Sequence, residues 1–253
     1  MPGDPLYRWL MYVVMGALLL IAVVKMPDRG RLFLGRILPP NWMSVVHVPI
    51  AWIGYFWLYK EGYYFAGLMM MCLSGALDLA DGRVARAYDR LAYRPLKDQR
   101  FLTQMNHLGI TPLGKTLDPA CDKTTFAPIF LDVCWTFCKK SSAVRNDGIL
   151  WLLYLGVFLI ILMLLVDFWG QLIRLDYFKH WRRKKDTSAT KVGKHKTLSQ
   201  WIWLALYPIW EQGWLPEAAT YYLLFLNVAL VVALTLAALS VLSKMRPIRM
   251  AWM

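Results

Sequence analysis

The sequence predicts an all-α integral membrane protein with a six-helix transmembrane core and one additional N-terminal membrane helix. Hydrophobic residues make up 58% of the 253 residues, whereas soluble domains contain roughly 45–50%. Mean hydropathy is correspondingly positive, at +0.40. The apolar residues are concentrated in long runs, and the formal net charge of +13 falls mostly between those runs. This distribution is typical of membrane-spanning helices joined by basic loops.

Seven apolar runs are the expected membrane helices. In chain order they are 7–26, 43–59, 63–80, 116–138, 149–173, 198–214 and 218–242. About twenty apolar residues cross a bilayer, so the shorter runs are marginal spans. The first run resembles a signal peptide, but it is long and basic residues follow it in place of a cleavage site. We expect an uncleaved helix that either spans the membrane or lies in its interface. The chain shows no repeat or long linker, so we predict a single transmembrane domain over residues 1–253.

Lysine and arginine predict the orientation of these helices. One set of helix ends is much more basic than the other, and it comprises 29–36, 83–115, 179–196 and 244–249. Basic ends face the cytoplasm in most membrane proteins. We therefore expect a protein of a bacterial cytoplasmic (inner) membrane, with the candidate site on the cytoplasmic side. The same charge would suit a nucleic-acid-binding protein, but the long apolar runs argue against that class.

Four carboxylates stand out because they lie beside apolar runs at helical spacing. Asp78 and Asp81 belong to one stretch, and Asp118 and Asp122 to another. A carboxylate inside a membrane costs roughly 2.5–3.5 kcal/mol, so four would cost on the order of 10 kcal/mol without compensation. Carboxylate oxygens are the ligands that Mg²⁺ and Mn²⁺ prefer. The pattern predicts a polar cavity that binds such ions, and two of them could clamp a pyrophosphate.

The spacing places the carboxylates of each stretch on one helix face. Residues three, four or seven positions apart share a face, and each stretch also carries small residues there. These small residues, which would let a ligand or a helix approach closely, are Gly82, Ala85 and Gly114. The structural alternative is an ion-pair network between the carboxylates and the cations Arg83, Arg86 and Lys123.

Together the two stretches resemble the motif D-x2-D-G-x2-A-R-x8-G-x3-D-x3-D of the CDP-alcohol phosphatidyltransferase family. Each fixed residue type is present in order, as Asp78, Asp81, Gly82, Ala85, Arg86, Gly114, Asp118 and Asp122. The chain departs from the motif in its middle, where residues 87–113 are about nineteen residues longer than the usual eight. We expect this cytoplasmic insertion to form either a helix or lid beside the site, or a tolerated surface loop.

The resemblance implies an enzyme that moves a phosphatidyl group from CDP-diacylglycerol to the hydroxyl of a polar alcohol and releases CMP. It implies that Mg²⁺ or Mn²⁺, in two positions, is held by Asp78, Asp81, Asp118 and Asp122. Asp122 would also be the catalytic base. The CDP-binding residues would be Asp81, Gly82, Ala85, Arg86 and Gly114. The family also leads us to expect a homodimer.

The acceptor is predicted from a second, shorter resemblance. Residues 193–200 are similar to the G-K-x-K-T-x-x-Q segment of phosphatidylglycerophosphate synthases, and 118–123 to their L-D-P-x-A-D-K segment. This favours glycerol 3-phosphate and a basic entry surface for it. The candidate acceptor-binding residues are Arg174, Lys191, Lys194 and Lys123.

Two other functions remain open. Those synthases usually carry Arg-Glu where this chain has Val166-Asp167, so inositol, inositol phosphate or another polyol is an alternative acceptor. Asp167 itself is predicted to line a polar interior. A divalent-cation transporter is less favoured, because a cation path has little use for Arg86 beside the carboxylates.

Residues 40–44 are similar to the P-N-x-x-[ST] stretch that opens a membrane helix in the family. We predict Asn41 or Ser44 as the N-cap of that helix. Family members commonly have arginine where this chain has His47. A buried histidine with satisfied hydrogen bonds is the favoured interpretation of His47, and a ligand role is the alternative.

Overall fold

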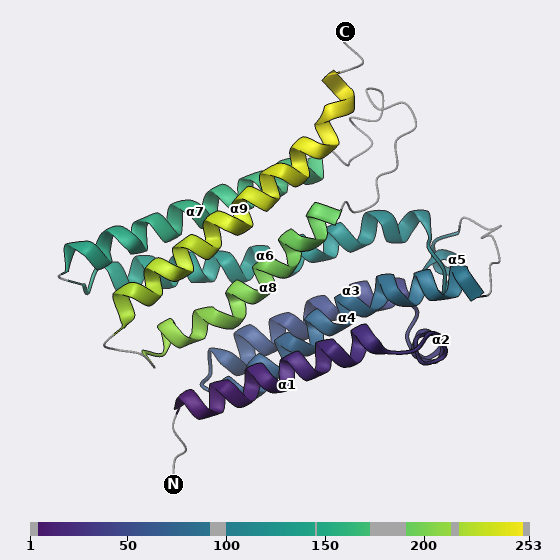
Figure 1. Ribbon diagram of the computed structural model, residues 1–253, viewed down its shortest axis with the longest axis horizontal. Coiled ribbons are helices and arrows are strands. Elements are labelled where there is room, and N and C mark those ends of the chain that lie inside the picture. Colours follow the sequence, from purple (N-terminus) through teal and green to yellow (C-terminus); the bar gives the residue numbers. More distant parts are fainter. Residues whose placement is uncertain (1–4, 92–99, 145, 173–190, 214–217, 250–253) are drawn as a thin grey trace. The chain divides into compact units, whose positions relative to one another are not determined.

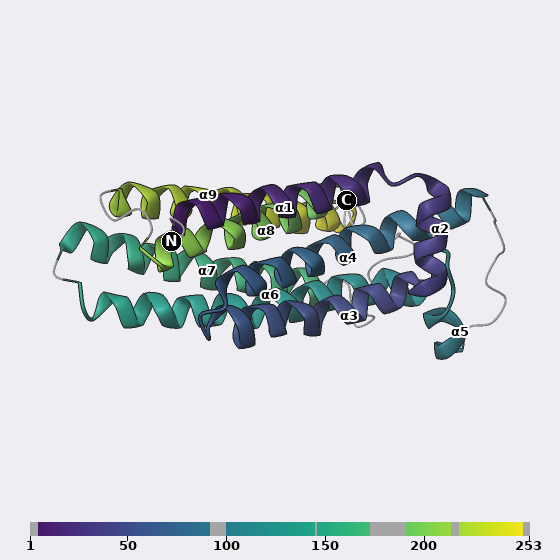
Figure 2. The same ribbon diagram turned by 90° about the horizontal axis from the view of Figure 1, so that it is seen from below.

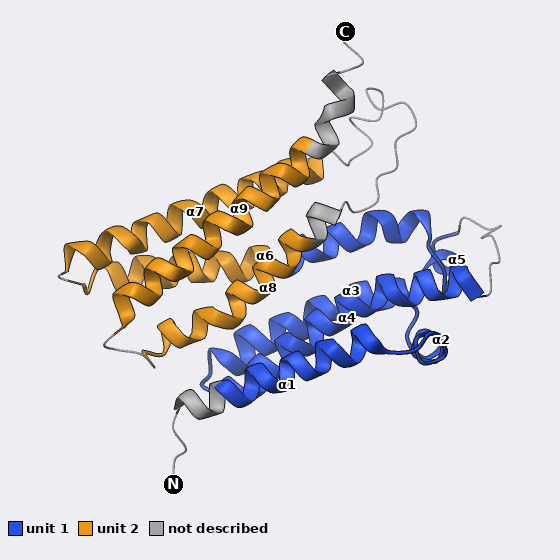
Figure 3. Ribbon diagram, viewed as in Figure 1, with its two compact units in different colours: residues 1–125 blue, residues 126–253 orange. Residues whose placement is uncertain are grey.

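The computed structural model describes residues 5–91, 100–144, 146–172, 191–213 and 218–249, and all regular structure in these ranges is helical (Figure 1). The elements are α1 (Pro5–Lys25), α2 (Asp28–Ile37), α3 (Pro40–Trp52), the π-helix η1 (Ile53–Tyr59), α4 (Tyr64–Leu91), α5 (Phe101–Met105), α6 (Pro112–Ser141), α7 (Asp147–Leu172), α8 (Lys191–Glu211) and α9 (Ala219–Arg249). They form two compact units, residues 1–125 and 126–253 (Figure 3), and the boundary falls inside α6.

Helix α4 is the central helix of the first unit. It packs against α1, α2, α3 and η1, and α1, α3 and α4 run along one another in both views (Figures 1 and 2). Glycines allow the closest of these approaches: a Cβ added to Gly54 would lie 2.8 Å from the carbonyl oxygen of Gly67. Toward the other end of α4, Met43, Ala80 and Val84 form a buried apolar cluster. This packing fixes the part of α4 that carries the first carboxylates.

The turn that precedes α4 follows the predicted break in the apolar pattern. Residues 60–63 separate η1 from α4, and Gly62 has a φ of +91°. Only glycine adopts this left-handed conformation without a steric penalty. The break at Lys60-Glu61-Gly62 therefore separates η1 from α4, and of the two apolar runs beside it the second lies in a helix long and apolar enough to cross a membrane.

The second unit is built around an aromatic core. Helix α9 packs against α7 and α8, and the side chains of Trp203 and Tyr207 on α8 are fully buried. These two rings stack with centroids 5.4 Å apart, and Phe130 of α6 contacts Trp203 at the same centroid distance. The aromatic rings thus join α6 and α8 within this unit.

Among the described residues, three helices are long and apolar enough to cross a membrane, namely Tyr64–Leu91, Asp147–Leu172 and Ala219–Leu242. The α1–α2 pair, bent by 105°, would be a fourth if it forms one span. Large apolar side chains point outward from α7, where Trp151 is 73% exposed and Phe168 63% exposed. Such a surface suits lipid. The predicted all-α membrane class is confirmed, whereas the predicted count of six helices plus one is not confirmed.

Candidate active site

Helices α4 and α6 carry the four motif carboxylates, and α3 lies beside them with Ser44. The Ser44 hydroxyl oxygen lies 2.7 Å from Oδ2 of Asp81 on α4 and 2.8 Å from Oδ1 of Asp118 on α6. Ser44 is 1% exposed and Asp81 is 5% exposed. The two halves of the motif therefore meet in the first unit, although the insertion separates them in sequence.

A second group joins the other two carboxylates to His47. One ring nitrogen of His47 and one carboxylate oxygen each of Asp78 and Asp122 all lie within 4.8 Å of one another. Two negative charges at or below that separation repel each other by about 3.5 kcal/mol or more at an effective dielectric constant of about 20. The arrangement therefore favours a bound cation or a shared proton.

Ser44 leads to the same conclusion for Asp81 and Asp118. Its hydroxyl has one hydrogen to donate, yet it faces these two carboxylates and the Pro40 carbonyl, 3.2 Å away. One donor cannot satisfy two ionised carboxylates at once. With four carboxylates and one imidazole so close together, the donor set fits a site for hard divalent cations such as Mg²⁺ or Mn²⁺.

The small residues of the motif lie at close contacts. The Gly114 N–H donates to Thr111 Oγ1 over 2.9 Å, and a Cβ on Gly114 would collide with the amide oxygen of Asn41. A Cβ on Gly82 would lie 3.1 Å from the guanidinium of Arg86. Gly114 thus lets α6 begin against α3, and Gly82 leaves room for the Arg86 side chain.

The predicted capping role of Asn41 and Ser44 is wrong. Helix α3 begins at Pro40 without a side-chain hydrogen bond at its cap. The Asn41 amide instead donates to the Gln104 carbonyl over 2.6 Å and to Thr111 Oγ1 over 3.0 Å. Both side chains bond to distant segments, which outweighs local capping because the partners are buried with them.

The later part of the insertion is anchored to the first unit. The Trp42 indole donates to the Asn106 side chain over 3.0 Å, and the Gln104 side chain accepts from the Leu113 N–H over 2.9 Å. The Ile110 N–H donates to the carboxylate of Asp89 on α4. Residues 92–99 lie outside the described part of the chain. The segment that follows them fixes the beginning of α6, and so the position of Gly114.

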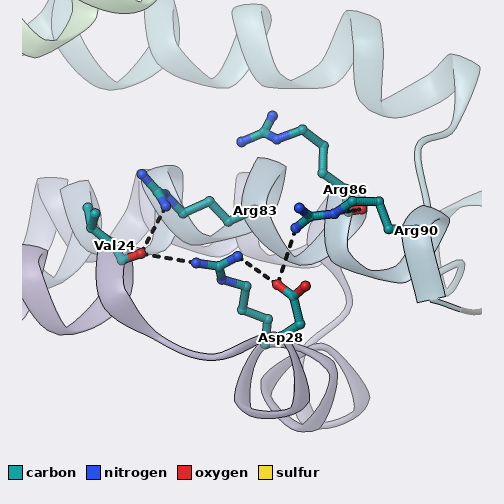
Figure 4. Close-up of polar contacts among 6 residues, drawn as sticks. Val24, Asp28, Arg83, Arg86 and Arg90 are labelled. Atoms are coloured by element: carbon teal, nitrogen blue, oxygen red, sulfur yellow. Dashed lines mark hydrogen bonds and ion pairs between the residues drawn. The ribbon is translucent and has the colours of Figure 1, made fainter.

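Arginines surround the end of α4 (Figure 4). Arg83 and Arg31 both donate to the Val24 carbonyl over 3.0 Å, and Asp28 accepts from Arg31 at 2.8 Å and from Arg90 at 3.2 Å. Arg86 is directed away from this group (Figure 4). The ion-pair alternative is therefore not supported for Arg83, whose partner is a backbone carbonyl. Arg86 is exposed.

The predicted acceptor residues are only partly described. Arg174 lies outside the described residues, and the side chains of Lys191 and Lys194, which begin α8, lie outside them too. Lys123 is half-buried on α6. Of these four residues, the structure therefore describes the side chain of Lys123 alone.

A buried ion pair in the second unit was not foreseen. Lys196 of α8 donates to Asp167 of α7 over 2.7 Å, and the Gln200 amide donates to the same carboxylate over 3.0 Å. All three side chains are buried. Lys196 belongs to the segment predicted as a basic entry surface, but it faces the interior. Asp167, a charged residue within an apolar run, was the signal in the sequence that could have indicated this partner.

The comparison with protein families identifies the chain. The model of the CDP-alcohol phosphatidyltransferase family matches residues 37–92 and 107–241, and its break falls within the insertion. Neither a curated protein nor a solved structure matches the chain. Enzymes of this family generally use divalent metal ions. Because the match covers most of the chain, this membrane protein belongs to the CDP-alcohol phosphatidyltransferase family and is an enzyme of that class.

Proposed function

We propose that this enzyme transfers the phosphatidyl group of CDP-diacylglycerol to the hydroxyl of glycerol 3-phosphate, with release of CMP. One observation carries the proposal: the carboxylates of both half-motifs approach one another through α3, where Ser44 lies between Asp81 and Asp118. The choice of acceptor rests on the similarity of residues 193–200 and 118–123 to phosphatidylglycerophosphate synthases.

Four carboxylates form the proposed metal site, and they are Asp78, Asp81, Asp118 and Asp122. Mg²⁺ or Mn²⁺, bound there in two positions, would neutralise the diphosphate of the donor and polarise it for attack. Ser44 holds two of these carboxylates at hydrogen-bonding distance, so their oxygens are positioned before the substrate binds.

The cytidine diphosphate is proposed to lie against the small residues of α4 and α6. Asp81, Gly82, Ala85 and Gly114 offer a close approach to backbone, and Arg86 donates charge-assisted hydrogen bonds to a phosphate. Its direction away from the Asp28 ion pairs (Figure 4) leaves its guanidinium available for this contact.

Asp122 is the proposed catalytic base. It accepts the proton of the acceptor hydroxyl, whose oxygen then forms a bond to the phosphorus that carries the lipid. The bond from that phosphorus to the CMP oxygen breaks, and CMP leaves. Holding both substrates in line supplies much of the acceleration. The acceptor phosphate would bind Arg174, Lys191, Lys194 and Lys123.

The wider architecture is proposed on the same basis. Six helices would form the transmembrane core, with α1 as an additional N-terminal helix, in one domain over residues 1–253. The enzyme would act as a homodimer in a bacterial inner membrane, with its carboxylates toward the cytoplasm. The basic residues near the end of α4 support that orientation.

An acceptor panel tests the proposed function. Purified protein with CDP-diacylglycerol is given glycerol 3-phosphate, inositol, inositol phosphate or another polyol, and CMP release is measured with Mg²⁺ or Mn²⁺. We expect the highest kcat/KM with glycerol 3-phosphate and none after chelation of the metal. A preference for an inositol compound would change the acceptor and keep the chemistry. Metal-independent release, or no release with any acceptor, would overturn the proposal. Ion flux in vesicles without nucleotide would instead indicate a transporter.

A further inference from the structure

His47 lies at the edge of the carboxylate site, and its hydrogen bonds define which ring nitrogen carries the proton. The side chain is 1% exposed, and Nδ1 lies 3.3 Å from the hydroxyl oxygen of Ser74. Ser74 donates its own hydrogen to the His47 carbonyl over 2.8 Å. Toward Nδ1 that hydroxyl can therefore only accept, which favours the tautomer with the hydrogen on Nδ1.

The other ring nitrogen is left with a lone pair. Among the described residues, Nε2 of His47 is buried and has no hydrogen-bond partner. Leaving a buried polar atom unsatisfied costs about 1–3 kcal/mol. An ordinary core histidine would satisfy both nitrogens. His47 instead combines one satisfied nitrogen with one basic nitrogen, beside Asp78 and Asp122.

We propose that His47 Nε2 is a nitrogen ligand of one divalent ion in the carboxylate site, together with Asp78 and Asp122. The inference rests on the metal site of the proposed function and adds a residue outside the carboxylate motif. Metal-binding histidines usually donate their second ring N–H to another group, which fixes the tautomer and the ring orientation. Ser74 is that group here. The hydroxyl oxygen of Thr125 lies 3.4 Å from Nδ1, on the same side of the ring as Ser74.

A nitrogen ligand changes which ion the site selects. Mg²⁺ binds almost only oxygen, whereas imidazole suits later first-row ions, and affinity for mixed nitrogen and oxygen ligands rises from Mn²⁺ onward. The position shared by His47, Asp78 and Asp122 should therefore prefer Mn²⁺ to Mg²⁺. Substitution of a histidine elsewhere in the chain should leave the affinities for Mn²⁺ and for Mg²⁺ unchanged.

Electron spin-echo spectroscopy of bound Mn²⁺ tests the inference without turnover. We expect the full-length protein in detergent, loaded with Mn²⁺ alone, to show coupling to an imidazole ¹⁴N nucleus. His47→Gln should abolish the coupling and weaken Mn²⁺ binding by about ten-fold or more, with little change for Mg²⁺. His195→Gln is the matched control, because His195 is an exposed residue of α8. It should leave the coupling and both affinities unchanged.

Isotope labelling keeps the test independent of any variant. When the wild-type protein is labelled with ¹⁵N-histidine, the spin-echo spectrum of bound Mn²⁺ should show coupling to ¹⁵N in place of coupling to ¹⁴N. A stoichiometric Mn²⁺ complex without histidine coupling, or coupling that persists in His47→Gln, would overturn the role of His47 while metal-dependent CMP release could still stand. Absence of Mn²⁺ and Mg²⁺ binding by the wild type would overturn the metal site and this inference with it.

Discussion

Replacing Ser44 by alanine removes the one hydroxyl between Asp81 and Asp118. The hydroxyl oxygen lies 2.7 and 2.8 Å from these carboxylates, but its single hydrogen makes only one full hydrogen bond. A hydrogen bond to a charged group contributes about 1.5–3 kcal/mol. If this contribution is realised in positioning the carboxylates for the transition state, kcat/KM should fall about 10- to 150-fold. If Ser44 made two full hydrogen bonds, one to each carboxylate, the fall in kcat/KM would be far larger.

The assay is CMP release as a function of CDP-diacylglycerol concentration at saturating metal. Ser44→Thr is the matched control, because it keeps the hydroxyl and is the other residue of the P-N-x-x-[ST] pattern. We expect Ser44→Thr to stay within a few-fold of wild type and both variants to unfold cooperatively on heating. Wild-type kcat/KM in Ser44→Ala, or an equal loss in both variants, would refute positioning by the hydroxyl.

Three further predictions concern other contacts. Asp122→Asn should abolish CMP release in a folded protein, and wild-type turnover would remove the assignment of Asp122 as the base. Lys196→Met should destabilise the protein by about 3–5 kcal/mol, because it leaves Asp167 charged and buried; thermal unfolding in detergent measures this, and the double variant with Asp167→Leu should recover most of the loss. Asn41→Ala should speed proteolysis within residues 100–111, since it removes two bonds to that segment; unchanged cleavage would show that the other contacts suffice.

The helices and the carboxylate faces were predictable because they depend on local spacing. Apolar runs predicted the positions of the helices, and the glycine-containing break at residues 60–62 predicted the turn before α4. The spacing of Asp78 and Asp81, and of Asp118 and Asp122, predicted that each pair lies along one helix. The helix repeat alone determines which residues share a face, so these features can be predicted from spacing without knowledge of the tertiary contacts.

The contacts between distant segments were not predictable in the same way. Ser44 and Asn41 looked like helix caps, because a capping pattern is read from neighbours, whereas their partners are dozens of residues away. Lys196 was predicted to belong to a basic surface, because its partner Asp167 lies on another helix and the two cannot be paired from local spacing. The number of membrane spans also stayed open, since the charged motif residues of α6 lower the mean hydropathy of a helix that the sequence predicted to span.

The boundary between the two units has a consequence for how acceptor choice can evolve or be engineered. Residues 1–125 contain every carboxylate of the motif, together with Ser44, His47 and the arginines of α4. The candidate acceptor residues Arg174, Lys191 and Lys194 belong to the other unit. Under the proposed function, exchange of residues 126–253 between relatives would change these three acceptor contacts, and it would leave Lys123 and the four carboxylates as they are. Helix α6, which runs through the boundary, is the natural place to join such a chimera.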